Sequence, residues 1–103
     1  MPKKQTDMGD EGQVQGRRDK TRIAKEQEQE ELRQVLQTQV GRAIIYRLMR
    51  ECGTYHSVFD TNALVMAFNE GRRHVGLTLL EEVLTDHNNA YIMMQHEANE
   101  KDK

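Results

Sequence analysis

The segment NEGRRHVG, residues 69–76, decides how the rest of the chain is interpreted. It holds two glycines five positions apart, Gly71 and Gly76, and two adjacent arginines, Arg72 and Arg73, inside a helical pattern. A glycine in a helix interior costs about 0.5–1 kcal/mol relative to alanine. The segment therefore predicts a place where backbones approach closely and where arginine side chains are directed at a partner.

Apolar residues on both sides of this segment repeat at helical spacing. Those that share one face lie four or seven positions apart, which matches the period of an α-helix. The pattern predicts a long helix over residues 61–85, with Asp60 or Thr61 as its N-cap. The apolar face consists of Leu64, Phe68, Val75, Leu79 and Val83.

The chain after this helix predicts a turn and a short last helix. Residues 86–89, with the sequence DHNN, are typical of turns, and Asn89 can cap the helix that follows. We expect this helix over residues 90–98 and a frayed tail over residues 99–103.

An amphipathic helix is also predicted upstream, over residues 39–52. Thr38 is a suitable N-cap, and Gly53 is a suitable left-handed stop after the last turn. The apolar residues of this helix step by four and are Val40, Ile44, Leu48 and Cys52.

Three glycines predict where the two amphipathic helices meet. Gly71 falls in the seven-residue gap of the apolar stripe, and Gly41 lies in the first turn of the neighbouring helix. A residue without a side chain lets a second backbone come close. We therefore expect a close helix crossing that involves Gly41, Gly71 and Gly76.

The N-terminal third of the chain is polar. Residues 17–37 are good helix formers without a continuous apolar face, and only the end of this segment can dock on a core. Either this helix stops before Thr38 or it continues through Thr38 into the next one. Residues 1–16 predict a flexible arm, which is either an ordinary frayed terminus or a tail that orders along a partner. The docking residues are Leu32, Val35 and Leu36.

These elements predict an all-α fold, a small antiparallel helical bundle or hairpin with a flexible N-terminal arm. The 103 residues allow one domain, and 36% hydrophobic residues allow only a modest core. No segment shows the two-residue alternation of a strand. Long exposed helices, or burial against other subunits, fit this composition.

Several functional classes lack support in the sequence. There is no apolar run long enough to span a bilayer, so no membrane anchor is expected. Cys52 is the only cysteine, and no pair among the four histidines has the four-residue spacing of helical zinc sites. No phosphate-binding loop or nucleophile with its base is present. We expect no enzyme activity, metal, cofactor or small-molecule substrate.

Charge is distributed unevenly, although the net charge is only -2. Residues 1–22 carry six basic and four acidic side chains, whereas residues 23–37 carry four acidic and two basic ones. This bias is weaker than that of a dedicated nucleic-acid-binding domain.

The chain resembles a family of small proteins from short-tailed bacteriophages, whose members are encoded among portal, capsid and tail genes. The resemblance covers about Leu32 to Glu97 and rests on a Gly-Arg and a Gly-Arg-Arg signature in the right order and separation. The segments that carry it are TQVGR at 38–42, Cys52-Gly53, the loop 55–59, and FNEGRRHVGL at 68–77.

This resemblance implies that the protein has a structural role in the virion, that it is made in the host cytoplasm and that it is present in several copies. The implied partners are portal, tail or internal head proteins near the portal vertex or inside the head, with packaged DNA as a further possibility. Two alternatives are an internal protein ejected with the genome into the host and a helical nucleic-acid-binding or regulatory protein outside the virion. The motif positions are Gly41, Arg42, Gly71, Arg72, Arg73 and Gly76.

The arginines have two possible roles. Their guanidinium groups suit the carboxylates of a neighbouring subunit as well as DNA phosphates. Alternatively, they pair with carboxylates within the fold and clamp the helices together. Both roles apply to Arg42, Arg50, Arg72 and Arg73.

Overall fold

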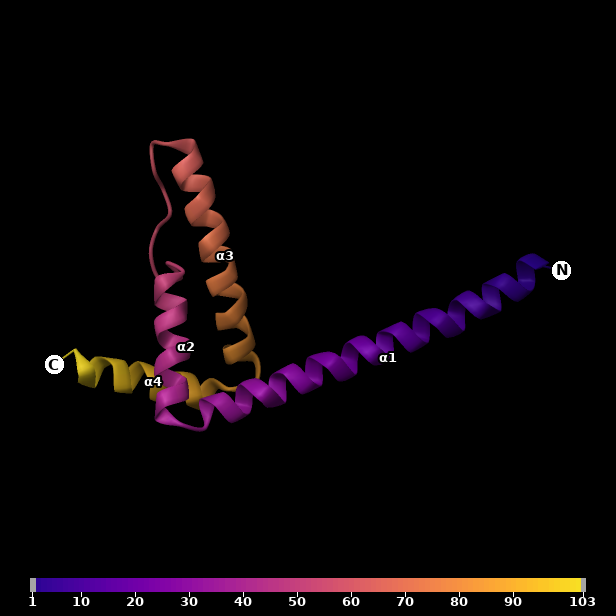
Figure 1. Cartoon of the computed structure of the whole chain (residues 1–103), viewed down its shortest axis with the longest axis horizontal. Coiled ribbons are helices and arrows are strands. Elements are labelled where there is room, and N and C mark those ends of the chain that lie inside the picture. The colour runs from indigo at the N-terminus through magenta and orange to yellow at the C-terminus, as the bar shows by residue number, and fades with distance from the viewer. Residues whose placement is uncertain (1, 103) are drawn as a thin grey trace. The chain divides into compact units, whose positions relative to one another are not determined.

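A computed structural model describes the backbone of residues 2–102 and the side chains of residues 11–102. Within that range the chain forms four helices and no strand (Figure 1). The predicted all-α fold is confirmed. The helices are α1 (Pro2–Leu36), α2 (Gln39–Glu51), α3 (Ala63–Asp86) and α4 (Asn88–Lys101).

The chain divides into two compact units, Met1–Glu31 and Leu32–Lys103, and each is described by itself. The first unit is the polar part of α1, where the described side chains are exposed or only partly covered. Arg22 lies 3.9 Å from both Asp19 and Glu26. Such exposed ion pairs within one helix contribute only a few tenths of a kcal/mol.

Helix α1 differs from the predicted N-terminal arm. It begins at Pro2, whereas the sequence analysis placed the start of the helix at residue 17 and an arm over residues 1–16. Residues 2–16 include the helix formers Lys, Gln, Met and Glu but also three glycines, so helix propensity alone does not explain the extension. The flexibility of this segment stays a prediction, and Met1 and the side chains up to residue 10 lie outside the described residues.

At the junction between α1 and α2 the chain leaves the helical conformation, so the two are separate helices and not one continuous helix through Thr38. Helix α1 ends at Leu36, and Thr38 has an extended conformation with φ -106° and ψ 151°. The Thr38 hydroxyl accepts a hydrogen bond from the Gly41 amide at 3.0 Å, which confirms Thr38 as an N-cap. Helix α2 ends at Glu51, and Gly53 has the predicted left-handed conformation with φ 72°.

The caps of the last two helices differ from the prediction. Asn62, rather than Asp60 or Thr61, caps α3 by accepting hydrogen bonds from the amides of Leu64 and Val65. Asp60 instead accepts from the Asn62 amide at 2.7 Å and holds the loop.

At the start of α4, His87 occupies the N-cap position and its side chain makes no capping hydrogen bond, and Asn89 lies inside the helix. Helix α4 then continues to Lys101, beyond the predicted end at residue 98 and into the predicted frayed tail. Lys103 lies outside the described residues.

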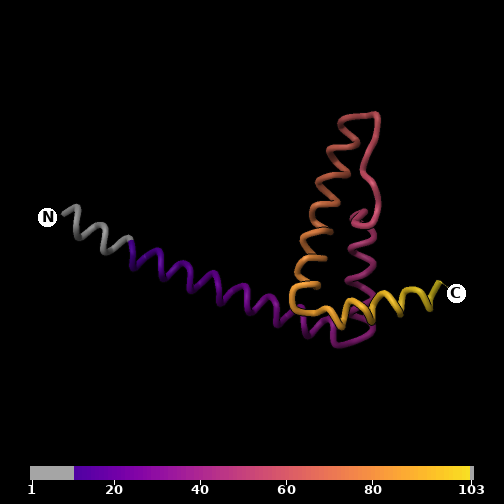
Figure 2. Tube along the Cα trace, turned by 180° about the vertical axis from the view of Figure 1, so that it is seen from behind, coloured from indigo at the N-terminus to yellow at the C-terminus, as the bar shows by residue number. Residues whose placement is uncertain are grey.

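In the second unit, α2 and α3 lie side by side and run in opposite directions, and α4 crosses α2 near its start (Figure 2). The core between them is small. Its buried side chains come from all four helices and are Leu36, Met49, Val83 and Met94. Partly buried residues, including Leu32, Ile45 and Leu79, surround them.

The apolar stripes predicted to form the core are mostly exposed. On α2 the stripe residues Val40, Ile44 and Leu48 are 41–70% exposed, and the buried residue is Met49. On α3 Leu64, Phe68 and Val75 are exposed, and only the far end at Val83 is buried. The core therefore lies beside the predicted stripes, because α4 packs on an adjacent side of α2.

Candidate functional site

Arg42 is held within the fold. Its side chain is 8% exposed, and its Nε donates a hydrogen bond to Glu97 Oε1 at 2.6 Å. A terminal nitrogen of the guanidinium donates to the Leu36 carbonyl at 2.9 Å. Arg42 thus ties α2 to α4 and to the end of α1. Of the two roles expected for the arginines, Arg42 therefore has the one within the fold, in which it clamps helices together. Glu97 was missed in the sequence because nothing local marks a partner 55 positions away.

Gly41 and Gly76 lie at close backbone contacts, but not at one shared crossing. A Cβ on Gly41 would overlap the Val35 carbonyl at the end of α1. A Cβ on Gly76 would overlap Thr54 Oγ1 and lie 2.8 Å from Cys52 Cβ. Gly76 therefore marks the approach of α3 to the end of α2, whereas Gly41 serves the junction of α1 and α2.

Gly71 is not part of any close contact. A Cβ at this position would meet no atom within 4 Å, and the residue is exposed. The predicted helix crossing at Gly71 is wrong. The periodicity placed Gly71 on the apolar stripe of α3, but this part of the stripe extends past the end of α2 and faces solvent.

Arg50 and Arg72 are brought together at the end of α2. Both are exposed and line a shallow hollow of about 250 Å³ with Asn69 and the loop residues Gly53 and His56. The Arg72 guanidinium also lies 5.8 Å from the centre of the Phe68 ring. This cation–π contact orients the arginine while its charge stays accessible.

Arg73 is half-buried on the neighbouring side of α3. Among the side chains that the structure describes, its buried Nε has no hydrogen-bond partner. The structure thus separates the four arginines: Arg42 is used within the fold, Arg50 and Arg72 keep exposed guanidinium groups that can reach a partner, and the unpaired Nε of Arg73 is buried. Their binding of a partner stays a prediction.

Three tyrosines from different parts of the chain meet beside the core and were not singled out in the sequence. The rings of Tyr46 and Tyr55 stack with their centres 6.0 Å apart. The hydroxyls of Tyr55 and Tyr91 lie 3.1 Å apart and share a hydrogen bond. Burial, followed by this hydrogen bond, raises the pKa of Tyr55 well above its usual value. The group is therefore a neutral contact that holds the loop after α2 onto α4.

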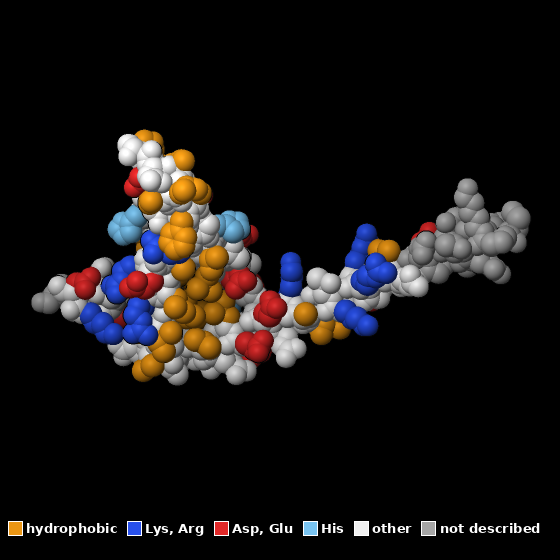
Figure 3. Space-filling model, turned by 45° about the horizontal axis from the view of Figure 1, so that its top comes forward, with side chains coloured by type: hydrophobic (Ala, Val, Ile, Leu, Met, Phe, Trp, Pro, Cys, Tyr) orange, Lys and Arg blue, Asp and Glu red, His pale blue; other side chains and the backbone are white. Residues whose placement is uncertain are grey.

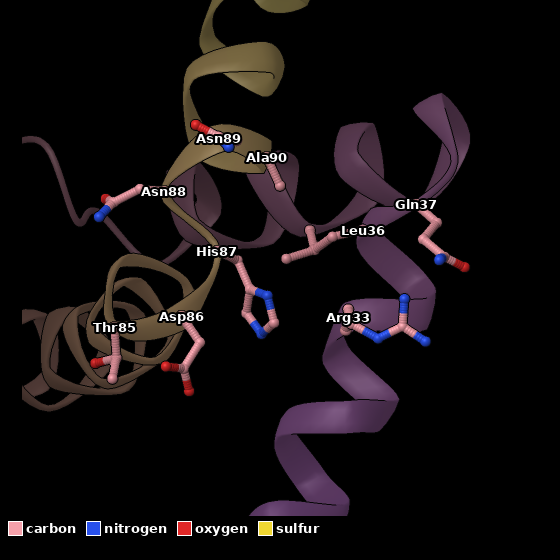
Figure 4. A pocket seen from close by; sticks show the side chains of 9 residues that line it. All are labelled: Arg33, Leu36, Gln37, Thr85, Asp86, His87, Asn88, Asn89 and Ala90. Carbon is pink, nitrogen blue, oxygen red and sulfur yellow. The ribbon is translucent and has the colours of Figure 1, made fainter.

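A polar hollow of about 490 Å³ lies where α3 passes into α4 (Figure 4). Figure 4 shows the His87 side chain pointing into the hollow, with Asp86 on one side and Arg33 on the other. Its lining comes from segments far apart in the sequence, so no sequence pattern marked it.

The described residues hold neither a metal-binding cluster nor a membrane-spanning helix. No group of three or more His, Cys, Asp or Glu side chains there comes together in a way that could hold a metal ion. None of the helices within that range is long and apolar enough to cross a membrane.

The surface also carries an apolar band over α2 and α3, which we name the α2–α3 face. In Figure 3 it runs along the two helices as a continuous band of hydrophobic side chains. Residues of this kind in scattered positions are ordinary, but a contiguous apolar patch on a small protein indicates an interaction surface. The face is defined by Val40, Ile44 and Leu48 of α2 and by Phe68 and Val75 of α3.

A family model described as Bbp19-like phage protein matches residues 32–96, which is more than half of the chain. The match begins where the second unit begins and ends within α4. No curated protein matches, and no solved structure matches. The matched range holds Arg42 and the whole α2–α3 face, and it ends one residue before Glu97. The chain therefore belongs to the family of Bbp19-like phage proteins.

Proposed function

We propose, from the membership of this chain in the Bbp19-like phage protein family, that it is a structural protein of the virion. In this proposal several copies bind portal, tail or internal head proteins, near the portal vertex of a short-tailed phage or inside its head. The observation that carries the proposal is the exposed α2–α3 face. A protein that worked alone would gain nothing from five exposed apolar side chains on one surface.

The small core supports the same proposal. Only four hydrophobic side chains among the described residues are buried, and large apolar side chains remain on the surface. Burying them against another subunit contributes about 25 cal/mol for each Å² removed from water. The family thus supplies the phage context, and the surface supplies a reason for assembly.

The arginines beside this face give the proposal its polar contacts. Arg50 and Arg72 present their charges at the end of α2. Guanidinium groups pair with carboxylates of a protein partner or with phosphates of packaged DNA.

The test is incorporation into particles. We expect the wild-type chain to be present in purified virions, and the Arg72→Ala chain to fold normally but to be incorporated at a several-fold lower copy number, as measured by quantitative mass spectrometry. Arg22→Ala, on the polar part of α1, is the matched control and should leave the copy number unchanged. Absence of the wild-type chain from virions would refute the structural role. Normal incorporation of Arg72→Ala would refute the part assigned to that arginine.

Measurements on the same particles also distinguish a fixed structural protein from an internal protein that is ejected with the genome. The small core favours this second candidate, because a weakly stabilised fold opens easily on passage through a narrow tail. Ejection requires particles emptied of DNA to lose the chain, whereas a fixed structural protein keeps the same copy number in full and emptied particles.

A nucleic-acid-binding role outside the virion is the third candidate. The observation that favours it is the exposed basic cluster of Arg17, Arg18 and Lys20 on α1. It requires a DNA gel shift by the purified chain that weakens steeply with salt. A chain that gives no shift at low salt excludes it.

A further inference from the structure

We propose that the α2–α3 face binds a second copy of this chain, in a symmetric dimer whose two-fold axis runs parallel to α2 and α3. Two observations carry the inference. The first is the apolar face itself, and the second is the opposite charge of its two margins. The inference does not depend on the virion role, because dimerisation is measured on the purified protein alone.

The apolar part of the face is contributed by both helices. Gly76 of α3 packs against Cys52 and Thr54 at the end of α2, so the two antiparallel helices are aligned at this point. Counting from it, Ile44 and Leu48 of α2 lie beside the part of α3 that follows Gly76. These side chains are close to half exposed, although Val83 on the neighbouring side of α3 is fully buried.

One margin of the face is basic on balance, with Arg47 and Arg50 against the acidic Glu51, and all three are exposed. Arg47 lies five residues before Cys52, which places it roughly 140° around α2 from the side that contacts α3. It follows Ile44 and Leu48 around the helix, so it borders the apolar residues on the side away from α3. Arg47 is exposed.

The other margin is acidic. Glu82 lies six residues after Gly76, roughly 120° around α3 from the side that contacts α2. It lies seven residues after Val75 and borders the apolar residues on the side away from α2. Glu82 and Arg47 are also at nearly the same level, since one is six and the other five residues from the aligned pair of Gly76 and Cys52.

This charge pattern selects both the occupant and the symmetry. A two-fold axis parallel to the helices places the basic margin of each copy opposite the acidic margin of the other, at the same level. Arg47 of one copy then faces Glu82 of the second copy, and the contact occurs twice. An axis across the helices would bring like margins together instead.

The resulting dimer is a four-helix bundle. Each α2 packs against the α3 of the second copy, and the two run in opposite directions, which is the usual arrangement of neighbours in such bundles. Val40, Ile44, Leu48 and Val75 become the new core. The apolar residues of the face are therefore buried in the dimer, as the amphipathic pattern of both helices predicts.

The experiment measures the mass of the full chain in solution by light scattering and sedimentation equilibrium. We expect twice the monomer mass for the wild type and the monomer mass for Leu48→Glu and Val75→Glu. Both replaced side chains are exposed in a single copy, so the variants should keep the helical circular dichroism of the wild type. Ile92→Glu, on an exposed apolar residue of α4 outside the face, is the matched control and should remain a dimer.

A charge exchange tests the symmetry. Arg47→Glu and Glu82→Arg should each weaken dimerisation roughly tenfold, because two ion pairs between an exposed arginine and a partly exposed glutamate are lost in each dimer, and the double variant should recover most of the loss. A wild-type chain that stays monomeric at the highest concentration reached would overturn the inference and leave the face to a different virion protein. Equal weakening by Ile92→Glu, or no recovery in the double variant, would overturn the proposed arrangement.

Discussion

At the scale of residues, Arg42 and Arg22 show how differently two arginines of one chain are used. Arg42 is buried, with its Nε 2.6 Å from a carboxylate and a second donor on a backbone carbonyl. Arg22 is exposed and lies 3.9 Å from each of its partners. Removing one partner of a buried ion pair leaves an uncompensated charge, whereas removing an exposed one leaves a group that water satisfies.

Arg42→Ala should therefore destabilise the fold by about 3 kcal/mol, at the low end for a broken buried pair because Glu97 keeps some exposure to water. Arg22→Ala should change the stability by less than about 1 kcal/mol. Urea unfolding followed by circular dichroism measures both. Equal losses in the two variants would show that Arg42 is not a clamp. The double variant Arg42→Met with Glu97→Leu should recover much of the loss, since it leaves no buried charge.

At the scale of elements, helix α3 contains two glycines whose surroundings are opposite. Gly76 is buried against the end of α2, and no other residue fits there without moving Thr54 or Cys52. Gly71 has open space around its Cα and faces solvent. The same residue type thus supports packing at one position and only weakens the helix at the other.

Gly71→Ala should raise the stability by about 0.5–1 kcal/mol, because alanine is the better helix former and nothing obstructs its methyl group. Gly76→Ala should lower the stability by about 1–3 kcal/mol, because the added methyl group overlaps Thr54. Thermal unfolding of the two variants gives opposite shifts in Tm. A loss of stability in Gly71→Ala would restore the helix crossing predicted from the sequence at that position.

At the scale of the whole molecule, the two units have different sources of stability. Every residue of the buried cluster belongs to the second unit, which begins at Leu32. In the first unit the described side chains of α1 are mainly exposed, and the helix has no continuous apolar face. A polar helix of this kind gains little from packing.

A chain that begins at Leu32 should consequently keep the cooperative unfolding and, within about 1 kcal/mol, the stability of the full chain. Denaturant unfolding of the two chains compares them directly. Loss of cooperative unfolding in the shortened chain would mean that the first unit contributes to the core. The family match from residue 32 onward agrees with this division.

The sequence alone determined the helical class, the cap at Thr38, the left-handed stop at Gly53 and the range of the family resemblance. These properties depend on the local chemistry of a few neighbouring residues: a hydroxyl before a helix, a glycine after it, and apolar side chains at helical spacing.

Only the tertiary structure decided which apolar stripe is buried and which arginine is used by the fold. Periodicity shows that α2 and α3 each have an apolar face, but the direction of that face depends on where α4 packs. The ion pair of Arg42 with Glu97 and the contact of Gly76 with Thr54 join distant parts of the chain. Such pairings are set by the packing of whole helices, which no local pattern encodes, and that packing leaves the α2–α3 face exposed.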